Sequence, residues 1–246
     1  MKNLGTLGLS LSAGPLLAGI LEGDEKNLKV IDNSRAVNSG KAQKITLLHT
    51  ADIHAQLYTH DEFFVENGNE VYKRRGGLAV LKTMINTLRN ENPTSTILID
   101  GGDCFQGGGV AALTQGAGLV PLINNIGYDL TLPGNWEVAY GKEMMLKDLG
   151  GYTSAKVCAN MFHDTPDDPN NEMIFSAYWI KSFGNLKLGF IGYNDPLTPK
   201  RQSPAYSKGI KFRKPEENVK NTLKSSKNRK DALWFSWSLT WDLHSR

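Results

Sequence analysis

Three short polar segments hold the side chains of this chain that are best suited to bind a metal ion. Asp52 and His54 stand two residues apart, Asp103 follows a pair of glycines, and Asn135 follows Gly134. Carboxylate and amide oxygens together with an imidazole nitrogen suit divalent cations such as Mn, Zn, Mg or Fe. Because they stand two residues apart, Asp52 and His54 point to the same side of an extended segment. An aspartate that lies between two metal ions can bind both of them. Each segment alone is weak evidence, because Asp-x-His and Gly-Gly-Asp also occur in ordinary turns.

The evidence is stronger because each polar segment follows a predicted strand. Short apolar runs predict buried strands, and apolar residues at helical spacing predict helices between them. The predicted strands cover residues 45–49, 96–100, 130–132, 156–159, 178–183 and 186–193. The predicted helices cover residues 78–92, 110–126, 140–149 and 215–225. This alternation favours an α/β layered sheet, in which the carboxyl ends of the strands share one edge, so we expect the three polar segments to converge there.

The composition limits the protein to ordinary globular classes. The chain has 246 residues and is 40% hydrophobic, enough for one large domain or two small ones. Its net charge of +3 comes from residues 220–246, which hold six basic and two acidic residues, so the remainder is close to neutral. A nucleic-acid polymer is therefore not an expected partner, because binding it needs a basic face on the folded body. Two cysteines are too few for a disulfide framework or a zinc knuckle.

The first 21 residues resemble an export signal. Residues 4–21 are uncharged and rich in Leu, Gly and Ala, and they follow a single basic residue, Lys2. Their glycines and modest hydrophobicity predict no stable membrane span. We therefore expect export to the periplasm, with a plain disordered leader as the alternative. If the signal is of the twin-arginine type, its two arginines would lie upstream of Met1. Residues 22–43 are polar and aperiodic, which predicts a linker before a domain that starts at residue 44.

Four strings, in their order along the chain, resemble the calcineurin-like metallophosphoesterase superfamily in its 5′-nucleotidase branch. They are His49–His54 (HTADIH), Arg75–Gly77 (RGG), Asp100–Asp103 (DGGD) and Gly134–Glu137 (GNWE). The resemblance covers residues 44–227. It implies an α/β fold, the four-layer αββα metallophosphoesterase sandwich, which would be incomplete at the C-terminus of this chain.

The resemblance also implies metal-binding roles. Asp52 and His54 would bind a first divalent cation, Asp103 would bridge both cations, and Asn135 would bind the second. The two cations, Mn, Zn, Mg or Fe, would activate water for the hydrolysis of a phosphate ester. The expected substrate is a small phosphorylated molecule of the nucleotide class.

One family position holds an unexpected residue. The family pattern places a catalytic His between Asn135 and Glu137, which would both be catalytic positions, but this chain has Trp136, whose indole cannot shuttle a proton. Residues 136–141, WEVAYG, are similar to the WEFTYG of thiosulfohydrolases, a sister branch that releases sulfate from a protein-bound cysteine S-thiosulfonate. That branch commonly has His in place of Asn135. A sulfur-ester hydrolase is therefore the alternative function. We expect Arg75 to contact the anionic substrate, with an ordinary solvated turn at residues 75–77 as the alternative.

Residues 228–246 depart from the family pattern. Family members continue with Ser-His-x-Gly and then Gly-His-x-His, which supply further metal ligands, and neither motif occurs here. Trp has a single codon, and a reading frame two nucleotides later allows Trp237–Asp242 to read Val-Ser-His-Leu-Gly. We therefore expect a frameshift near residue 230 and an aberrant tail over residues 228–246. An inactive truncated fragment is the third interpretation of the chain.

Overall fold

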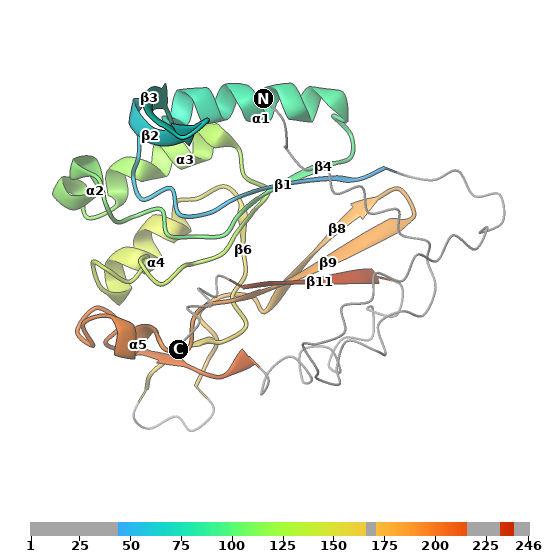
Figure 1. Cartoon of the computed structure of the whole chain (residues 1–246). Coiled ribbons are helices and arrows are strands. Elements are labelled where there is room, and N and C mark those ends of the chain that lie inside the picture. Colours follow the sequence, from blue (N-terminus) through green and yellow to red (C-terminus); the bar gives the residue numbers. More distant parts are fainter. Residues whose placement is uncertain (1–43, 166–170, 216–231, 239–246) are drawn as a thin grey trace. The chain divides into compact units, whose positions relative to one another are not determined.

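The computed structural model describes residues 44–165, 171–215 and 232–238 (Figure 1). The predicted leader and linker, residues 1–43, lie outside this part of the chain. The described body forms one unit that starts at Ile45, close to the predicted domain start. Within the described residues, no helix has the length and apolar character needed to cross a membrane.

Four parallel strands form the sheet that carries the predicted site. They are β1 (Thr46–Thr50), β4 (Thr96–Asp100), β5 (Leu130–Thr131) and β6 (Ala155–Lys156), in the spatial order β1-β4-β5-β6. All five residues of β4 are buried, as expected for a central strand covered on both faces. The predictions of β1 and β4 are confirmed, whereas β5 and β6 are shorter than predicted because only two residues of each pair in the ladder.

A second sheet packs against the first. It contains β8 (Tyr178–Phe183), β9 (Leu186–Tyr193) and β11 (Ala232–Ser238), in the order β11-β9-β8. The predicted β8–β9 hairpin is confirmed, with Gly184 at φ 57° in its turn. Strand β11 pairs parallel to β9 although its residues fall within the predicted aberrant tail. Ile97 and Ile99 of β4 pack in one apolar cluster with Phe190 of β9, which joins the two sheets.

Helices cover the opposite face of the first sheet, where Leu98 of β4 packs in a second apolar cluster. The covering helices are α1 (Leu78–Glu91), α2 (Gly109–Thr114), the 3-10 turn η1 (Ala117–Leu119), α3 (Val120–Ile126) and α4 (Lys142–Gly150), whereas the short α5 (Thr198–Arg201) contributes no residue to this cluster. The prediction of one helix over residues 110–126 is wrong. Gln115 and Gly116 adopt left-handed φ angles of 52° and 96°, and a Cβ at residue 116 would lie 2.6 Å from Asp148 Oδ2. The chain therefore breaks between α2 and η1.

The layers follow from these two clusters: helices α1, α3 and α4, then the parallel sheet, then the second sheet (Figure 1). They supply the first three layers of the predicted αββα sandwich. Pro215 is helical, as predicted, and the rest of the helix predicted to residue 225 lies outside the described residues.

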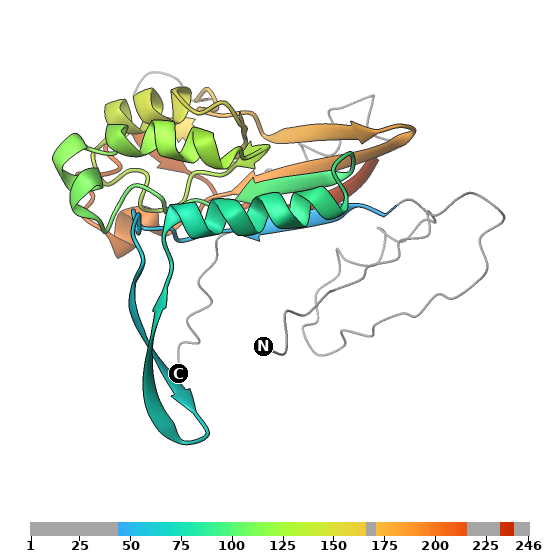
Figure 2. The same cartoon turned by 90° about the horizontal axis from the view of Figure 1, so that it is seen from above.

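Two strand pairs were not predicted. Strands β2 (His60–Glu66) and β3 (Asn69–Arg75) form an antiparallel ribbon that extends from the body (Figure 2). Strands β7 (Met161–His163) and β10 (Ile210–Phe212) form a short antiparallel pair, in which β7 is the strand that follows β6 in the sequence.

Candidate metal centre

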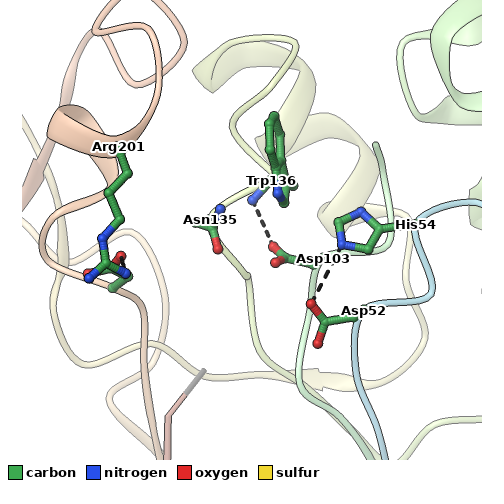
Figure 3. A pocket seen from close by; sticks show the side chains of 7 residues that line it. Asp52, His54, Asp103, Asn135, Trp136 and Arg201 are labelled. Atoms are coloured by element: carbon green, nitrogen blue, oxygen red, sulfur yellow. Dashed lines mark hydrogen bonds and ion pairs between the residues drawn. The ribbon is translucent and has the colours of Figure 1, made fainter. Parts of the chain in front are cut away.

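The loops after β1, β4 and β5 meet at one edge of the parallel sheet. Backbone hydrogen bonds tie the first two loops together: Asp52 N–H donates to Gly102 O at 2.9 Å, and His54 N–H donates to Asp103 O at 2.9 Å. Asp52, His54 and Asp103 each offer one ligand atom, and these atoms lie within 4.8 Å of one another. The sequence predicted this convergence, and Figure 3 shows the three side chains together.

The backbone of this site is locally strained. Asp52, His54 and Asp103 adopt left-handed φ angles of 57°, 47° and 59°. Such a conformation costs a non-glycine residue about 1–2 kcal/mol, and it persists where the surroundings fix it. Gly102 lies against the backbone of Gly134, so a side chain at residue 102 would separate the second and third loops. Three costly conformations at one point are typical of a functional site.

The polar atoms of the three residues are arranged for a cation. His54 Nδ1 lies 3.1 Å from the carbonyl of Gln106, which can only accept, so we assign the proton to Nδ1 and a lone pair to Nε2. Nε2 lies 3.6 Å from Asp52 Oδ1, a buried oxygen that has no hydrogen-bond partner among the described residues. Two electron-pair donors therefore face each other without a proton between them. This donor set fits a divalent cation, which would pair with both atoms.

Glu137 lies behind the candidate ligands. Its side chain accepts hydrogen bonds from the backbone N–H groups of Asp103, Cys104 and Gly134 at 2.8, 2.7 and 2.6 Å. Glu137 is 1% exposed and is not among the residues that line the pocket described below. Glu137 thus joins the loop after β4 to the loop after β5. The sequence predicted a catalytic position for Glu137, whereas the structure places it behind the pocket.

Buried carboxylates crowd the back of the site. Burial raises the pKa of Asp100 to about 7, although the Cys104 thiol donates to its Oδ2 at 3.3 Å. Burial and then the charge of Glu137 raise the pKa of Asp103. Burial also raises the pKa of Glu137, against the effect of its backbone donors. Carboxylates that are buried beside one another resist ionising together, and a bound cation would relieve their repulsion.

A pocket of about 180 Å³ opens in front of the three candidate ligands. Asn135 and Trp136 line it from the loop after β5, and the backbone N–H of Trp136 donates to Asp103 Oδ1 at 2.8 Å. The Trp136 indole lies edge-on to the His54 ring, with 6.5 Å between ring centroids. Asp195 and Arg201 complete the lining, and they form an ion pair of 2.7 Å.

Sequence reasoning missed Asp195 and Arg201. The rule that located the other loops applies to them as well, because Asp195 stands two residues after the predicted strand 186–193. Arg75, the predicted substrate contact, lies elsewhere: it ends β3, its guanidinium donates to Arg74 O at 2.9 Å, and it stacks 5.7 Å from the Phe64 ring. Arg75 does not line the pocket.

Comparisons with known proteins agree with this architecture. Residues 45–237 match the family described as calcineurin-like phosphoesterase. A 5′-nucleotidase of Vibrio cholerae is 28% identical over 192 residues, which cover 77% of this chain and 32% of that protein. Human 5′-nucleotidase is 28% identical over 193 residues, which cover 76% of this chain and 33% of that protein. The chain spans about a third of the length of these curated relatives.

Solved structures show the same fold. The sulfate thiohydrolase SoxB of Thermus thermophilus superposes with a TM-score of 0.69 at 19% identity, over 82% of this chain and 45% of that one. A 5′-nucleotidase precursor from the same species superposes with a TM-score of 0.65 at 23% identity, over 79% of this chain and 36% of that one. The metallophosphoesterase fold expected from the four strings is thereby confirmed.

Proposed function

The chain belongs to the calcineurin-like phosphoesterase family, and we propose on that premise that it is a metal-dependent hydrolase of phosphate esters, with nucleoside monophosphates as its substrate class. One observation carries the proposal: Asp52, His54 and Asp103 converge with their ligand atoms within 4.8 Å, and a buried oxygen of Asp52 has no hydrogen-bond partner among the described residues. The 5′-nucleotidase relatives support the substrate class.

The residues in front of the sheet would hold two divalent cations of the Mn, Zn, Mg or Fe type. Asp52 and His54 would bind the first cation, Asp103 would be shared, and Asn135 would bind the second. Bound divalent cations neutralise charge on phosphoryl oxygens and make water a better nucleophile.

The protein's own groups would fix the positions of these ligands. The Gln106 carbonyl holds the tautomer of His54, so that Nε2 can accept a cation. The backbone N–H of Trp136 donates to Oδ1 of Asp103, which would leave the other oxygen of Asp103 to bind the cation. In place of the catalytic role expected from the sequence, we propose that Glu137 is a positioning residue, since it holds the loops that carry Asp103 and Asn135.

Trp136 affects how the leaving group would obtain its proton. The indole Nε1–H donates hydrogen bonds but does not ionise near neutral pH, so Trp136 cannot act as a general acid. Among the described residues, the pocket lining holds no imidazole besides that of His54, which would be occupied as a ligand. We therefore expect good leaving groups to be cleaved faster than alkyl phosphates.

Hydrolysis measurements test the proposal directly. The purified chain would be assayed with Mn²⁺ or Zn²⁺ on AMP and on p-nitrophenyl phosphate, together with Asp103→Asn and with Asp61→Asn as a matched exposed control. We expect metal-dependent hydrolysis that falls at least about 100-fold in Asp103→Asn and is unchanged in the control. A chain without metal-dependent hydrolysis, or one in which Asp103→Asn is as active as the parent, would contradict the proposal and favour the inactive fragment.

A sulfur-ester hydrolase is the second candidate, and Trp136 is the observation that favours it. The same preparations would be offered a cysteine S-thiosulfonate peptide, with release of sulfate as the readout. Faster release from this peptide than from AMP would favour the sulfur substrate, and the reverse would favour the nucleotide.

We further propose export of the protein to the periplasm, on the composition of residues 4–21. Cell fractionation with and without these residues tests it. Recovery of the full chain in the cytoplasm alone would overturn the assignment.

A further inference from the structure

We infer that Arg201 binds the non-bridging oxygens of the substrate's tetrahedral oxyanion, opposite the candidate metal ligands. The oxyanion is a phosphoryl or a sulfonate group, which share charge and shape. This inference rests on the proposed hydrolase function and adds a residue to it.

The position of Arg201 in the pocket is the first argument. Seven residues line this pocket, and Arg201 is the one among them with a permanent positive charge. Figure 3 shows it on the far side of Asn135 from Asp52, His54 and Asp103. A substrate held between the two sides would meet the metal ligands on one side and a guanidinium on the other.

The pairing of Arg201 leaves donors available. Its Nη1 contacts Asp195 Oδ2 at 2.7 Å, and the side chains are 42% and 7% exposed, respectively. Guanidinium has five N–H donors in a planar fork, and one carboxylate oxygen cannot satisfy them all. Asp195 is itself held, since its Oδ1 accepts the Leu197 N–H at 2.9 Å. The buried carboxylate therefore orients the guanidinium and leaves part of the fork open to the pocket.

The segment that carries Arg201 is anchored to the site. The Asn194 side-chain amide donates to Pro133 O at 2.8 Å and to Gly134 O at 2.7 Å, directly before Asn135. Thr198, the first residue of α5, donates to Asn194 Oδ1 at 3.0 Å. These buried hydrogen bonds fix α5 relative to the loop that lines the pocket. A surface ion pair without a function would not need such an anchor.

The charges of the pocket give the fourth argument. Asp52, Asp103 and Asp195 place three carboxylates around a small volume, which would repel an anionic substrate. Cations at the metal ligands would offset two of them, and Arg201 offsets the third. The planar fork matches two oxygens of a tetrahedral oxyanion, a match that the point charge of lysine lacks.

Anion binding by the Mn²⁺-loaded chain tests the inference. Isothermal titration with inorganic phosphate, and separately with thiosulfate, would compare the parent with Arg201→Ala, Arg201→Lys and the control Lys200→Ala. Lys200 is exposed, adjacent and outside the pocket lining, so its variant removes the same charge. We expect phosphate affinity to fall about tenfold or more in Arg201→Ala, less in Arg201→Lys, and to stay within about twofold in the control. Mn²⁺ should still bind all three variants, and the thermal midpoint should fall only in the Arg201 variants, because Asp195 loses its ion-pair partner there.

The outcomes separate this inference from the proposed function. Equal phosphate binding by Arg201→Ala and the parent, an equal loss in Lys200→Ala, or a parent that binds neither anion would overturn the inference. Hydrolysis of p-nitrophenyl phosphate is followed in the same samples. A parent that binds phosphate through Arg201 but hydrolyses nothing would overturn the proposed function and support the inference. Tighter Arg201-dependent binding of thiosulfate than of phosphate would support the inference and identify a sulfur oxyanion as the ligand.

Discussion

The β2–β3 hairpin and the loops after β1, β4 and β5 both carry several charged side chains, but they pair them differently. In the hairpin, exposed partners are available: His60 lies 3.0 Å from Glu62, and Lys73 contacts Glu66 across the strands. At the candidate site, Asp100 at the end of β4 is buried beside Asp103 and Glu137 of the loops, and the hydrogen bonds to these carboxylates come from backbone N–H groups and the Cys104 thiol.

This difference distinguishes a solvated surface from a candidate site. Exposed ion pairs contribute about 0–1 kcal/mol each, so the number of charges in the hairpin carries little information about function. Buried carboxylates that face each other cost stability unless a cation or backbone donors compensate. Burial of several carboxylates together, rather than charge density, is therefore the signal for a metal centre here, and the two regions should respond very differently to substitution.

The largest difference is expected at two glutamates. Glu137→Gln places an amide nitrogen against backbone N–H donors that now bond to a carboxylate, and an unsatisfied buried donor costs about 1–3 kcal/mol. We expect a loss of about 3 kcal/mol in the free energy of unfolding, measured by urea titration with EDTA. Glu62→Gln in the hairpin is the matched control, with a loss below about 0.5 kcal/mol. Equal losses in the two variants would remove the distinction between the regions.

Metal affinity should separate the regions next. Asp52→Asn removes a charged ligand and should weaken Mn²⁺ binding about 100-fold, which corresponds to about 2.7 kcal/mol. Its stability without metal should not fall, because Asp52 Oδ1 has no hydrogen-bond partner among the described residues to lose. Calorimetric titration with Mn²⁺ measures both variants, with Asp61→Asn in the hairpin as the control. Unaltered affinity in Asp52→Asn would exclude Asp52 as a ligand.

The stability of the metal-free chain should depend on pH through Asp100. The pKa of this buried carboxyl is about 7 in the folded chain and near 3.8 without burial. Between these values the unfolded chain binds fewer protons than the folded chain, so stability falls as the pH rises from about 4 to 7. The slope is at most about 1.4 kcal/mol per pH unit from this group. Asp100→Asn should flatten the decline between pH 5 and 7 in urea titrations, and an identical slope in both proteins would contradict the assignment.

Much of this arrangement could be predicted from the sequence. The apolar runs at residues 45–49 and 96–100 predicted buried parallel strands, and the polar residues just after them predicted the converging loops. Asp52, His54 and Asp103 could be found in this way because residues that directly follow parallel strands lie together at one edge of the sheet. Glu137 could be located but not assigned, since its bonds to the backbone of the loop after β4 depend on tertiary structure.

Other features were hidden by tertiary effects. Apolar residues continue through residues 110–126, and the break lies at Gln115 and Gly116. Gly116 is a local helix-end signal that the apolar pattern outweighed, whereas its close approach to Asp148 depends on tertiary structure. Arg201 reaches the pocket only because Asn194 anchors its segment to a loop 60 residues away in the sequence. The hairpin was missed because its strands carry charged residues on both faces, so they lack the alternation of a half-buried strand.

The tip of the hairpin nevertheless contained a usable signal. Asn67 and Gly68 both adopt positive φ angles, 52° and 80°, as in the tight turns that Asn-Gly favours. Nothing lies within 4 Å of a Cβ at Gly68, so Gly68→Ala should cost only backbone strain, about 1 kcal/mol. Gly109→Ala, which also meets open space but lies in α2 without a positive φ, is the control. Hydrogen exchange of the hairpin amides should increase in Gly68→Ala and not in Gly109→Ala.

The smallest effect is expected at Arg75, where the comparison between the regions is sharpest. The sequence predicted a substrate contact, whereas Arg75 stacks on Phe64 and donates to Arg74 O at the base of the exposed ribbon. An exposed cation–π contact contributes about 0.5–1 kcal/mol. Arg75→Ala should therefore lower the free energy of unfolding by that amount at most and leave phosphate affinity within about twofold of the parent. A tenfold loss of phosphate binding would restore the predicted contact, because it would mean that the ribbon bends toward the pocket when an anion is bound.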